Sequence, residues 1–171
     1  MDEFELRKPG EEDEAAYEEF IREFRDADEK IIPSSADPKG LSFSDWLAKR
    51  RRYDEGIDLP PDKVPASFYF LFNGNRIVGA LSIRHKLNDH LLFVGGNIGY
   101  GVAPSERRKG YASHMLSQAL DICRRIGLKK VLITCDKENI GSAKTIQKNG
   151  GELENEVLEN GVVKQRYWIE L

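Results

Sequence analysis

The chain has 171 residues, and its hydrophobic content of 40% is enough for a compact core, so we expect a single domain over residues 1–171. The formal net charge of -3 argues against a general nucleic-acid binder, which would need a strongly basic face. The sequence shows no leading apolar segment like a signal peptide or membrane span, and its two cysteines, Cys123 and Cys135, lack the spacing of a zinc site. We therefore expect a cytoplasmic protein with no membrane, nucleic-acid or metal partner.

The N-terminal third predicts a strand followed by two helices. Residues 4–7 are expected to form an edge strand, and the acidic run at 11–14 suits a helix N-terminus. The apolar residues that follow recur at helical spacing and predict a core-facing stripe: Tyr17, Phe20, Ile21 and Phe24. After a loop at 31–40 that is rich in Pro, Ser and Gly, Ser44 is expected to cap a second helix that carries Trp46, Leu47 and Tyr53.

Four consecutive cations, Lys49 to Arg52, lie on this second helix. On a helix, four successive side chains point in different directions, so we interpret most of the run as a solvated surface. Contact with an acidic substrate is the alternative interpretation.

The central part of the chain predicts antiparallel strands. Residues 68–72 and 77–83 are expected to pair through a turn at Asn73-Gly74-Asn75. A polar break at 85–90 follows, and then a strand at 98–102 in which apolar residues alternate with Gly99 and Gly101. Glycine at every second position is typical of a strand against which a ligand or another backbone lies closely.

The stretch after this strand predicts an anion site. Pro104 ends the strand, and three cations then precede a helix whose first N–H groups have no partner inside the helix. Gly110 would let the backbone approach the anion, and Ala112 keeps the first turn slim.

The rest of the chain predicts alternating helices and strands. Apolar residues on one face of the helix after Gly110 are expected to pack on the sheet until Gly127, and a buried strand at 131–134 would run parallel to the strand at 98–102. Asn139 is expected to cap a helix bearing Ile140, Ala143 and Ile146. Residues 153–158 and 163–169 predict a final hairpin.

These residues resemble the GNAT superfamily of N-acetyltransferases. The segment Arg107 to Ala112, RRKGYA, is similar to the family's pyrophosphate-binding turn, Q/R-x-x-G-x-G/A, and stands between a strand and a helix. Asn139, Ser142, Lys148 and Gly150 match the family's later helix beside the pantetheine arm. The resemblance covers residues 68–171 and implies a mixed α/β (α+β) fold, in which helices flank a twisted central mixed sheet and two splayed parallel strands bind the cofactor.

The resemblance implies acetyl-CoA as co-substrate and no metal. Backbone amides and cations at the turn would bind its pyrophosphate, and the splayed strand would pair with the pantetheine amides. The expected cofactor-binding residues are Tyr100, Gly101, Val102, Arg107, Arg108, Lys109, Gly110, Tyr111, Ala112, Ser113, Asn139 and Ser142. The Val102 backbone N–H is the expected oxyanion donor.

The residues that would handle protons are less clearly marked. A lysine-like amine is deprotonated about once in 2,500 molecules at pH 7, so a general base would help, but the family's usual Glu on the central strand is absent here. His85 is our first candidate base, ahead of Asp89, His90 and Asp136, and a structural histidine is the alternative. Where relatives carry a Tyr acid this chain has Ile146, which leaves Tyr100 and Tyr111 as conceivable donors.

The predicted function is therefore acetyl transfer from acetyl-CoA to a primary amine by direct attack on the thioester. The acceptor can be a small-molecule amine or an amine of a peptide or protein, and the sequence leaves the oligomeric state open, a homodimer included. The alternatives are a non-catalytic acyl-CoA sensor, because the usual acid and base positions are empty, and a nucleic-acid binder that uses Lys49 to Arg52. A nucleotide-binding protein is disfavoured, because the glycines match neither a dinucleotide fingerprint nor a Walker lysine pattern.

Overall fold

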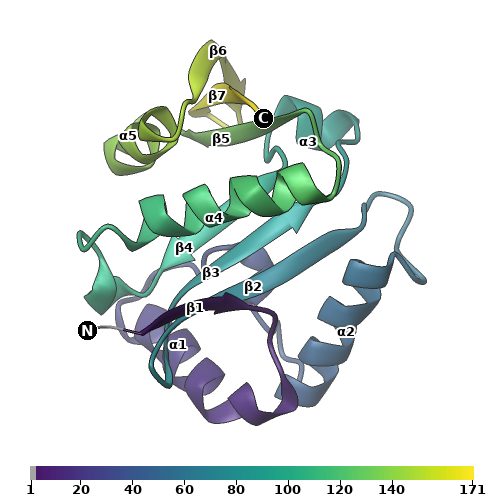
Figure 1. Ribbon diagram of the computed structural model, residues 1–171, viewed down its shortest axis with the longest axis vertical. Helices are drawn as coiled ribbons and strands as arrows, with labels where there is room; N and C mark the ends of the chain where they lie inside the picture. Colours follow the sequence, from purple (N-terminus) through teal and green to yellow (C-terminus); the bar gives the residue numbers. More distant parts are fainter. Residues whose placement is uncertain (1–2) are drawn as a thin grey trace.

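The computed structural model describes residues 3–171; residues 1 and 2, which belong to the expected domain, lie outside the described residues. Its strands form two antiparallel sheets (Figure 1). The first has the order β1-β2-β3-β4, with β1 at Phe4–Arg7, β2 at Ala66–Asn73, β3 at Arg76–Arg84 and β4 at Ile98–Val102. The second has the order β5-β7-β6, with β5 at Lys130–Asp136, β6 at Glu152–Glu159 and β7 at Val162–Glu170.

Five α-helices and three short 3₁₀ turns connect the strands within residues 3–171. The helices are α1 at Glu14–Asp26, α2 at Phe43–Glu55, α3 at Asp89–Phe93, α4 at Tyr111–Arg125 and α5 at Ile140–Lys148. The turns are η1 at Glu11–Asp13, η2 at Ser34–Ala36 and η3 at Pro104–Glu106. Helix α4 lies between the two sheets, whereas α1 and α2 cover the opposite face of the first sheet (Figure 1).

An aromatic cluster fixes α1 and α2 on the first sheet. Tyr17 of α1 stacks on Trp46 of α2 with ring centroids 4.5 Å apart, and Trp46 stacks in turn on Phe70 of β2 at 5.8 Å. The two polar ring atoms in this cluster are satisfied, because the Tyr17 hydroxyl donates to the Ala36 carbonyl and the Trp46 indole N–H donates to the Ser35 carbonyl. The predicted α1 stripe is therefore core, as expected.

A second apolar cluster joins both sheets through α4. Leu81 and Ile98 of the first sheet and Val131 and Tyr167 of the second meet the buried face of α4. The α4 residues of this face are Leu116, Ala119, Leu120 and Cys123. Burial of this apolar face away from water stabilises the packing of the second sheet against the first.

The two sheets touch where β4 and β5 begin. The Asn97 backbone N–H donates to the Leu132 carbonyl at 2.7 Å, and the Leu132 N–H donates to the Asn97 side chain at 2.9 Å. Three residues further along each strand, Tyr100 packs in the apolar cluster that contains Cys135, so β4 and β5 run in the same direction. The two strands nevertheless belong to separate sheets and share no ladder. The mixed α/β fold and the splayed parallel pair are as expected, but the splay divides the expected central sheet into two.

One local expectation was wrong. Ser42, and not Ser44, caps α2, because its hydroxyl accepts the Asp45 N–H at 3.1 Å. Residues 89–93 form the short helix α3, and Ile140 on α5 is 63% exposed and faces away from the core. None of the helices within residues 3–171 is long and apolar enough to cross a membrane.

Phe70 is the test of the aromatic cluster. It is fully buried and stacks on Trp46, so Phe70→Ala should lower the free energy of unfolding by about 3–5 kcal/mol. Chemical denaturation measures this loss. Phe93→Ala, at a side chain that is 44% exposed, is the control and should cost less than about 1 kcal/mol. Equal losses in the two variants would contradict the assigned core.

Candidate active site

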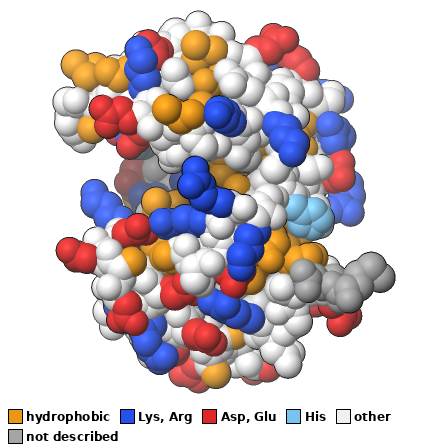
Figure 2. Space-filling model, turned by 90° about the vertical axis from the view of Figure 1, so that its left-hand side faces the viewer, with side chains coloured by type: hydrophobic (Ala, Val, Ile, Leu, Met, Phe, Trp, Pro, Cys, Tyr) orange, Lys and Arg blue, Asp and Glu red, His pale blue; other side chains and the backbone are white. Residues whose placement is uncertain are grey.

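The larger cavity of the protein lies where β4 separates from β5. It has a volume of about 830 Å³, and its walls are β4, the N-terminal turns of α4 and α5, and the loop after α1. Figure 2 shows it as a hollow between the upper and lower parts of the molecule, with Lys and Arg side chains along its rim and apolar surface inside. This size suits a ligand of several tens of atoms.

The cavity contains nearly all residues predicted to bind the cofactor. Those that line it are Tyr100, Gly101, Val102, Arg107, Arg108, Gly110, Tyr111, Ala112, Ser113, Asn139 and Ser142. Lys109 does not line it, because its ammonium turns back to Glu106 at 2.9 Å. Residues far apart in the sequence thus form one surface.

The hydrogen-bonding pattern of β4 leaves one edge of this strand free. The Arg84 N–H donates to the Asn97 carbonyl, and the Ala103 N–H donates to the Val78 carbonyl. Because hydrogen-bonded pairs alternate along an antiparallel ladder, the β4 residues that bond to β3 are 97, 99, 101 and 103. The backbone groups of Tyr100 and Val102 therefore point away from β3, toward the gap before β5. An extended chain of amides in the cavity can bond to this edge as an added strand.

Gly101 is required by a close approach of backbone. A Cβ atom at this position would overlap the carbonyl of Ile32, in the loop after α1. At Gly101 the glycine thus reflects a neighbouring backbone, one of the two interpretations that the sequence allowed, whereas a Cβ atom at Gly99 would make only ordinary contacts with side chains. The loop in turn forms part of the cavity wall.

The turn before α4 presents its backbone to the cavity. Arg108 and Gly110 both have left-handed φ angles, 63° and 86°. Gly110 is the N-cap residue of α4, and the N–H groups of the first helical turn, at Tyr111 to Ser113, have no acceptor inside the helix. Successive amides at such a turn, together with the helix dipole, favour an anion.

Carboxylates hold two of the three cations of this turn. Arg107 forms two hydrogen bonds with Glu29, at 2.6 and 3.0 Å, and this pairing raises the pKa of Arg107 and lowers the pKa of Glu29. Lys109 pairs with Glu106. Arg108 lines the cavity and has no ion pair among residues 3–171. An entering phosphate would therefore find one available cation at once, and Arg107 after exchange or sharing with Glu29.

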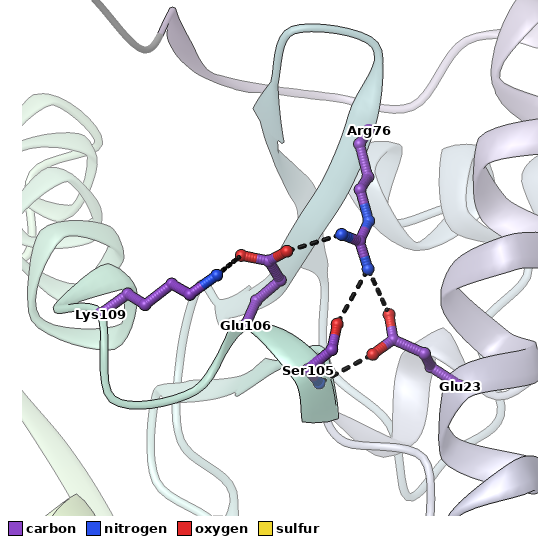
Figure 3. A network of polar contacts seen from close by, with 5 residues as sticks. All are labelled: Glu23, Arg76, Ser105, Glu106 and Lys109. Carbon is purple, nitrogen blue, oxygen red and sulfur yellow. Dashed lines mark hydrogen bonds and ion pairs between the residues drawn. The ribbon is translucent and has the colours of Figure 1, made fainter.

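A polar network fixes the turn to the rest of the protein (Figure 3). Arg76, at the start of β3, donates to Glu106 at 2.6 Å, to Glu23 of α1 at 2.9 Å and to the Ser105 hydroxyl at 2.9 Å. Glu23 also accepts the Ser105 backbone N–H at 2.7 Å. The network thus joins α1, β3 and η3 immediately before the anion-binding turn.

Glu23 depends on this network for its charge. Burial alone raises the pKa of Glu23, but the hydrogen bonds from Ser105 and Arg76 lower it more, so its pKa lies below the ordinary value. The folded state therefore favours the carboxylate. Stability from this group is complete above the ordinary Glu pKa of about 4.3 and is lost as the pH falls through the lowered pKa.

The start of α5 closes the other side of the cavity. The Asn139 side chain accepts the Ser142 N–H at 3.1 Å, as predicted for an N-cap. The Ser142 hydroxyl lies 2.9 Å from the Tyr100 hydroxyl, and burial raises the pKa of Tyr100 to about 12. Tyr100 is therefore protonated at neutral pH and can donate a hydrogen bond in the gap.

His85 lies outside both cavities. Its Nε2 is 2.7 Å from the Ser67 hydroxyl, which donates to Asp54 at 2.5 Å, and Asp54 in turn pairs with Lys8. Burial lowers the pKa of His85, so the imidazole is neutral at pH 7. This chain of contacts ties β1, α2, β2 and β3 together. The structure does not bring His85 to Tyr100 and Val102.

A smaller cavity of about 290 Å³ lies on the α2 side of the first sheet. Its walls come from α2, η2, the end of β3, and α3 with the residues after it. His90, a reserve candidate base, lines it, whereas Asp136 is held by Lys164 at 2.5 Å. No group of three or more His, Cys, Asp or Glu side chains within residues 3–171 is placed to hold a metal ion.

The sequence did not reveal the residues that position the turn. Arg76 reaches Glu106 across 30 residues and Glu23 across 53, and Ser105 reaches Glu23 across 82. No periodicity or spacing marks such contacts. The repeated Glu and Arg residues of α1 gave no sign of which one would face the site.

A sequence model of the acetyltransferase (GNAT) domain matches residues 4–152. The chain belongs to the GNAT acetyltransferase family. This confirms the predicted family, and with it the prediction of an acyltransferase enzyme. A search of curated proteins found no match for this GNAT protein.

Solved structures agree with the fold. RimJ of Mycobacterium smegmatis, in complex with a CoA disulfide, has a TM-score of 0.73 at 21% identity, over 98% of this chain and 81% of that chain. An acetyltransferase of Salmonella typhimurium that modifies the N-terminal serine of ribosomal protein L7/L12 has a TM-score of 0.68 at 18% identity, over 98% and 95% of the two chains. YncA of the same organism, with acetyl-CoA, has a TM-score of 0.66 at 16% identity, over 98% and 94%.

Gly110 tests the anion-binding turn. Its φ of 86° means that Gly110→Ala should lose about 1–2 kcal/mol of stability through strain alone. Thermal unfolding with and without acetyl-CoA should also show a reduced ligand-induced shift, with Gly110→Asp reduced further because a negative charge faces the phosphates.

Gly127→Ala is the matched control for this prediction. Gly127 has a similar φ of 91°, is equally free of neighbouring atoms and follows the other end of α4. It should lose comparable stability and keep the full shift with acetyl-CoA. A full shift in Gly110→Asp would show that the pyrophosphate does not bind at this turn.

Glu23 tests the polar network. At pH 7, Glu23→Gln should lower the free energy of unfolding by about 1.5–3 kcal/mol, because charged hydrogen bonds to Arg76 and Ser105 are lost. The difference from wild type should shrink as the pH falls through the lowered pKa of Glu23, because the wild-type carboxylate then takes up a proton. Denaturant unfolding between pH 3 and 7 measures both. Glu19→Gln, on the exposed face of the same helix, should differ little from wild type at any pH.

Proposed function

We propose that this GNAT protein transfers the acetyl group of acetyl-CoA to the α-amine of a peptide or protein N-terminus, by direct attack of the amine on the thioester. One observation carries the proposal: the free backbone edge of Tyr100 and Val102 and the anion-binding turn at Gly110 line the same cavity. Such a surface matches a ligand that has amides at one end and a pyrophosphate at the other.

The residues fit acetyl-CoA along its length. The amides of Tyr111 to Ser113, with Arg108 and Arg107, would hold the pyrophosphate, and the outward backbone groups of β4 would pair with the pantetheine amides. When bound, acetyl-CoA supplies an acyl group activated as a thioester. The apolar lining, which includes Phe24 and Ile32, would exclude water from that bond.

In this proposal the Val102 amide stabilises the developing negative charge. Its N–H points into the gap and is held by a ladder that stays fixed on both sides, at Gly101 and Ala103. A donor that is oriented before the reaction needs no reorganisation as the carbonyl oxygen becomes negative. A single such donor contributes roughly 3–4 kcal/mol in other acyl-transfer enzymes.

The ionisable side chains that line the larger cavity favour an α-amine as acceptor. The two carboxylates that line the larger cavity, Glu29 and Glu106, are both already paired with cations. An α-amine with a pKa of about 7.7–8.0 is neutral in about one molecule in ten at pH 7, against one in 2,500 for a lysine amine. This difference, about 3.4 kcal/mol, lets an α-amine react where no base is placed.

Tyr100 and Ser142 can assist the leaving thiol. Their hydroxyls bond to one another in the gap, and Tyr100 remains protonated at neutral pH, so either can donate a hydrogen bond to the departing sulfur. A thiol of pKa about 8.5 leaves as a thiolate at a cost of only about 2 kcal/mol at pH 7. A hydrogen bond is therefore sufficient, and a strong acid is not needed.

The solved structures also support an α-amine as the acceptor. The Salmonella typhimurium protein described above modifies an N-terminal serine, which is an α-amine acceptor. At 18% identity this likeness establishes the fold, and the choice of acceptor rests on the proton argument. The rival interpretation, a non-catalytic acyl-CoA sensor, shares the cavity and the turn but predicts no acetylated product.

The pH dependence of turnover tests the proposed acceptor. With a short peptide that has a free N-terminus and no lysine, kcat/KM should rise about tenfold per pH unit below pH 7 and level off near the pKa of the α-amine, about 8. Thiol release measures the rate, and the product should gain one acetyl mass at its N-terminus. The matched peptide with a blocked N-terminus and one internal lysine should react at least about 100-fold more slowly at pH 7. Equal rates would contradict the α-amine assignment, and binding of acetyl-CoA without any acetylated product would favour the sensor.

A further inference from the structure

The side chains that line the smaller cavity carry an excess of positive charge, although the protein as a whole is acidic. Five cations line it, Lys39, Lys49, Arg50, Lys63 and Arg84, against two carboxylates, Asp37 and Asp62. The whole chain has a formal net charge of -3, so this balance runs against the rest of the sequence. Part of the Lys49 to Arg52 run thus lines a cavity and is not simply solvated.

The two guanidinium groups of this cavity are largely buried and lack acidic partners. Arg84 donates to the carbonyls of Gly95 and Gly96, at 3.0 and 3.1 Å, and forms no ion pair within residues 3–171. Arg50 lies over the Tyr53 ring at 4.7 Å, and its buried Nε has no hydrogen-bond partner. Burial lowers the pKa of both groups. Such cations cost folding free energy that a bound anion would offset.

Lys49 adds to the positive charge around Arg50 and Arg84. Burial lowers its pKa first, and the neighbouring charges of Arg50, Lys39, Arg52 and Lys63 lower it further. The two carboxylates offset only part of this charge. Asp37 accepts the backbone N–H of Lys39, and Asp62 pairs with Lys63 at 3.8 Å at the exposed rim, so neither is paired with Arg50 or Arg84. At the larger cavity, by contrast, Glu29 and Glu106 hold Arg107 and Lys109.

The smaller cavity also adjoins the reacting strand. A Cβ atom built on Gly99 would lie 3.8 Å from the Arg84 guanidinium, so Arg84 reaches the face of β4 itself. Gly99 precedes Val102 by three residues, which corresponds to roughly 10 Å along a strand. An extended peptide covers that distance in about three residues. A volume of about 290 Å³ holds a side chain or two, not a second cofactor.

We propose that this cavity binds a carboxylate of the acceptor, so that the preferred substrate is a chain with Asp or Glu two to four residues after its reacting N-terminus. Arg50 and Arg84 bind the carboxylate, and Lys49 contributes long-range attraction. The proposal rests on the proposed acetylation of α-amines and adds the substrate class. The carboxylate comes from an acidic side chain inside a longer peptide or from the free carboxyl end of a very short one.

Matched peptides provide the test. Octapeptide amides with a free N-terminal Ser and either Glu or Gln at positions 3 and 4 are compared by thiol release. Wild type should show a kcat/KM at least about tenfold higher for the Glu peptide, which is the effect of one charge-assisted contact. Arg50→Gln should bring the Glu peptide down to the Gln level and leave the Gln peptide unchanged. A free tripeptide, Ser-Ala-Ala, compared with its amide, shows whether a terminal carboxylate serves as well.

Two variants separate this role from folding and from general charge. Arg52→Gln removes a cation from the same helix that is exposed and does not line the cavity, and it should keep the preference for Glu. Lys49→Gln should reduce the preference only part of the way. Because Arg84 also holds the Gly95 and Gly96 carbonyls, Arg84→Gln is used only if it unfolds at the wild-type temperature.

A binding measurement makes the outcome independent of turnover. Glutarate, added at matched ionic strength, should raise the unfolding temperature of wild type and of Arg52→Gln but not of Arg50→Gln. Equal kcat/KM for the Glu and Gln peptides would overturn the acidic preference and leave the acetyl transfer intact. If no peptide is acetylated, the proposed function fails, and the glutarate measurement then decides whether the carboxylate site stands. The absence of a glutarate-induced rise in the unfolding temperature would overturn the carboxylate site as well.

Discussion

The separation of β4 from β5 is the feature on which the site depends. The two strands start together, held by the bonds between Asn97 and Leu132, and then continue in different sheets. Backbone amides inside a protein normally pair with one another, so a free strand edge lined by apolar groups is costly unless a ligand completes it. Helix α4 supports this arrangement, because its apolar face packs on both sheets.

The anion-binding turn depends on charges that come from elsewhere in the chain. Its own conformation is local, with left-handed residues at Arg108 and Gly110. Its position, however, is set by Arg76, which bonds to Glu106 and Glu23 and so fixes η3 between β3 and α1. Hydrogen bonds between charged groups are directional and comparatively strong, and a turn that must present several amides to one anion needs that rigidity.

The two cavities treat positive charge differently. At the larger one, Glu29 and Glu106 hold Arg107 and Lys109, which keeps the turn ordered when no anion is bound. At the smaller one, Arg50 contacts the Tyr53 ring and Arg84 contacts the Gly95 and Gly96 carbonyls, which are neutral groups. Paired cations contribute to the architecture, whereas unpaired buried cations retain free energy that an incoming anion can release. The second arrangement is the one expected of a site that selects a substrate.

The sequence by itself determined the elements and most of the lining of the larger cavity. Helical spacing identified Tyr17 and Phe24 as core, and the Asn-Gly turns located the hairpins. The order of strand, basic glycine turn and helix predicted the anion site. Each of these signals lies within a few residues of the chain. Only the tertiary structure decided that Lys109 turns away, that His85 belongs to a chain of contacts with Ser67 and Asp54, and that Arg84 and Arg50 line the same second cavity. These contacts join residues that are far apart in sequence, and charge pairing across such distances follows from how helices and sheets pack, for which no local pattern exists.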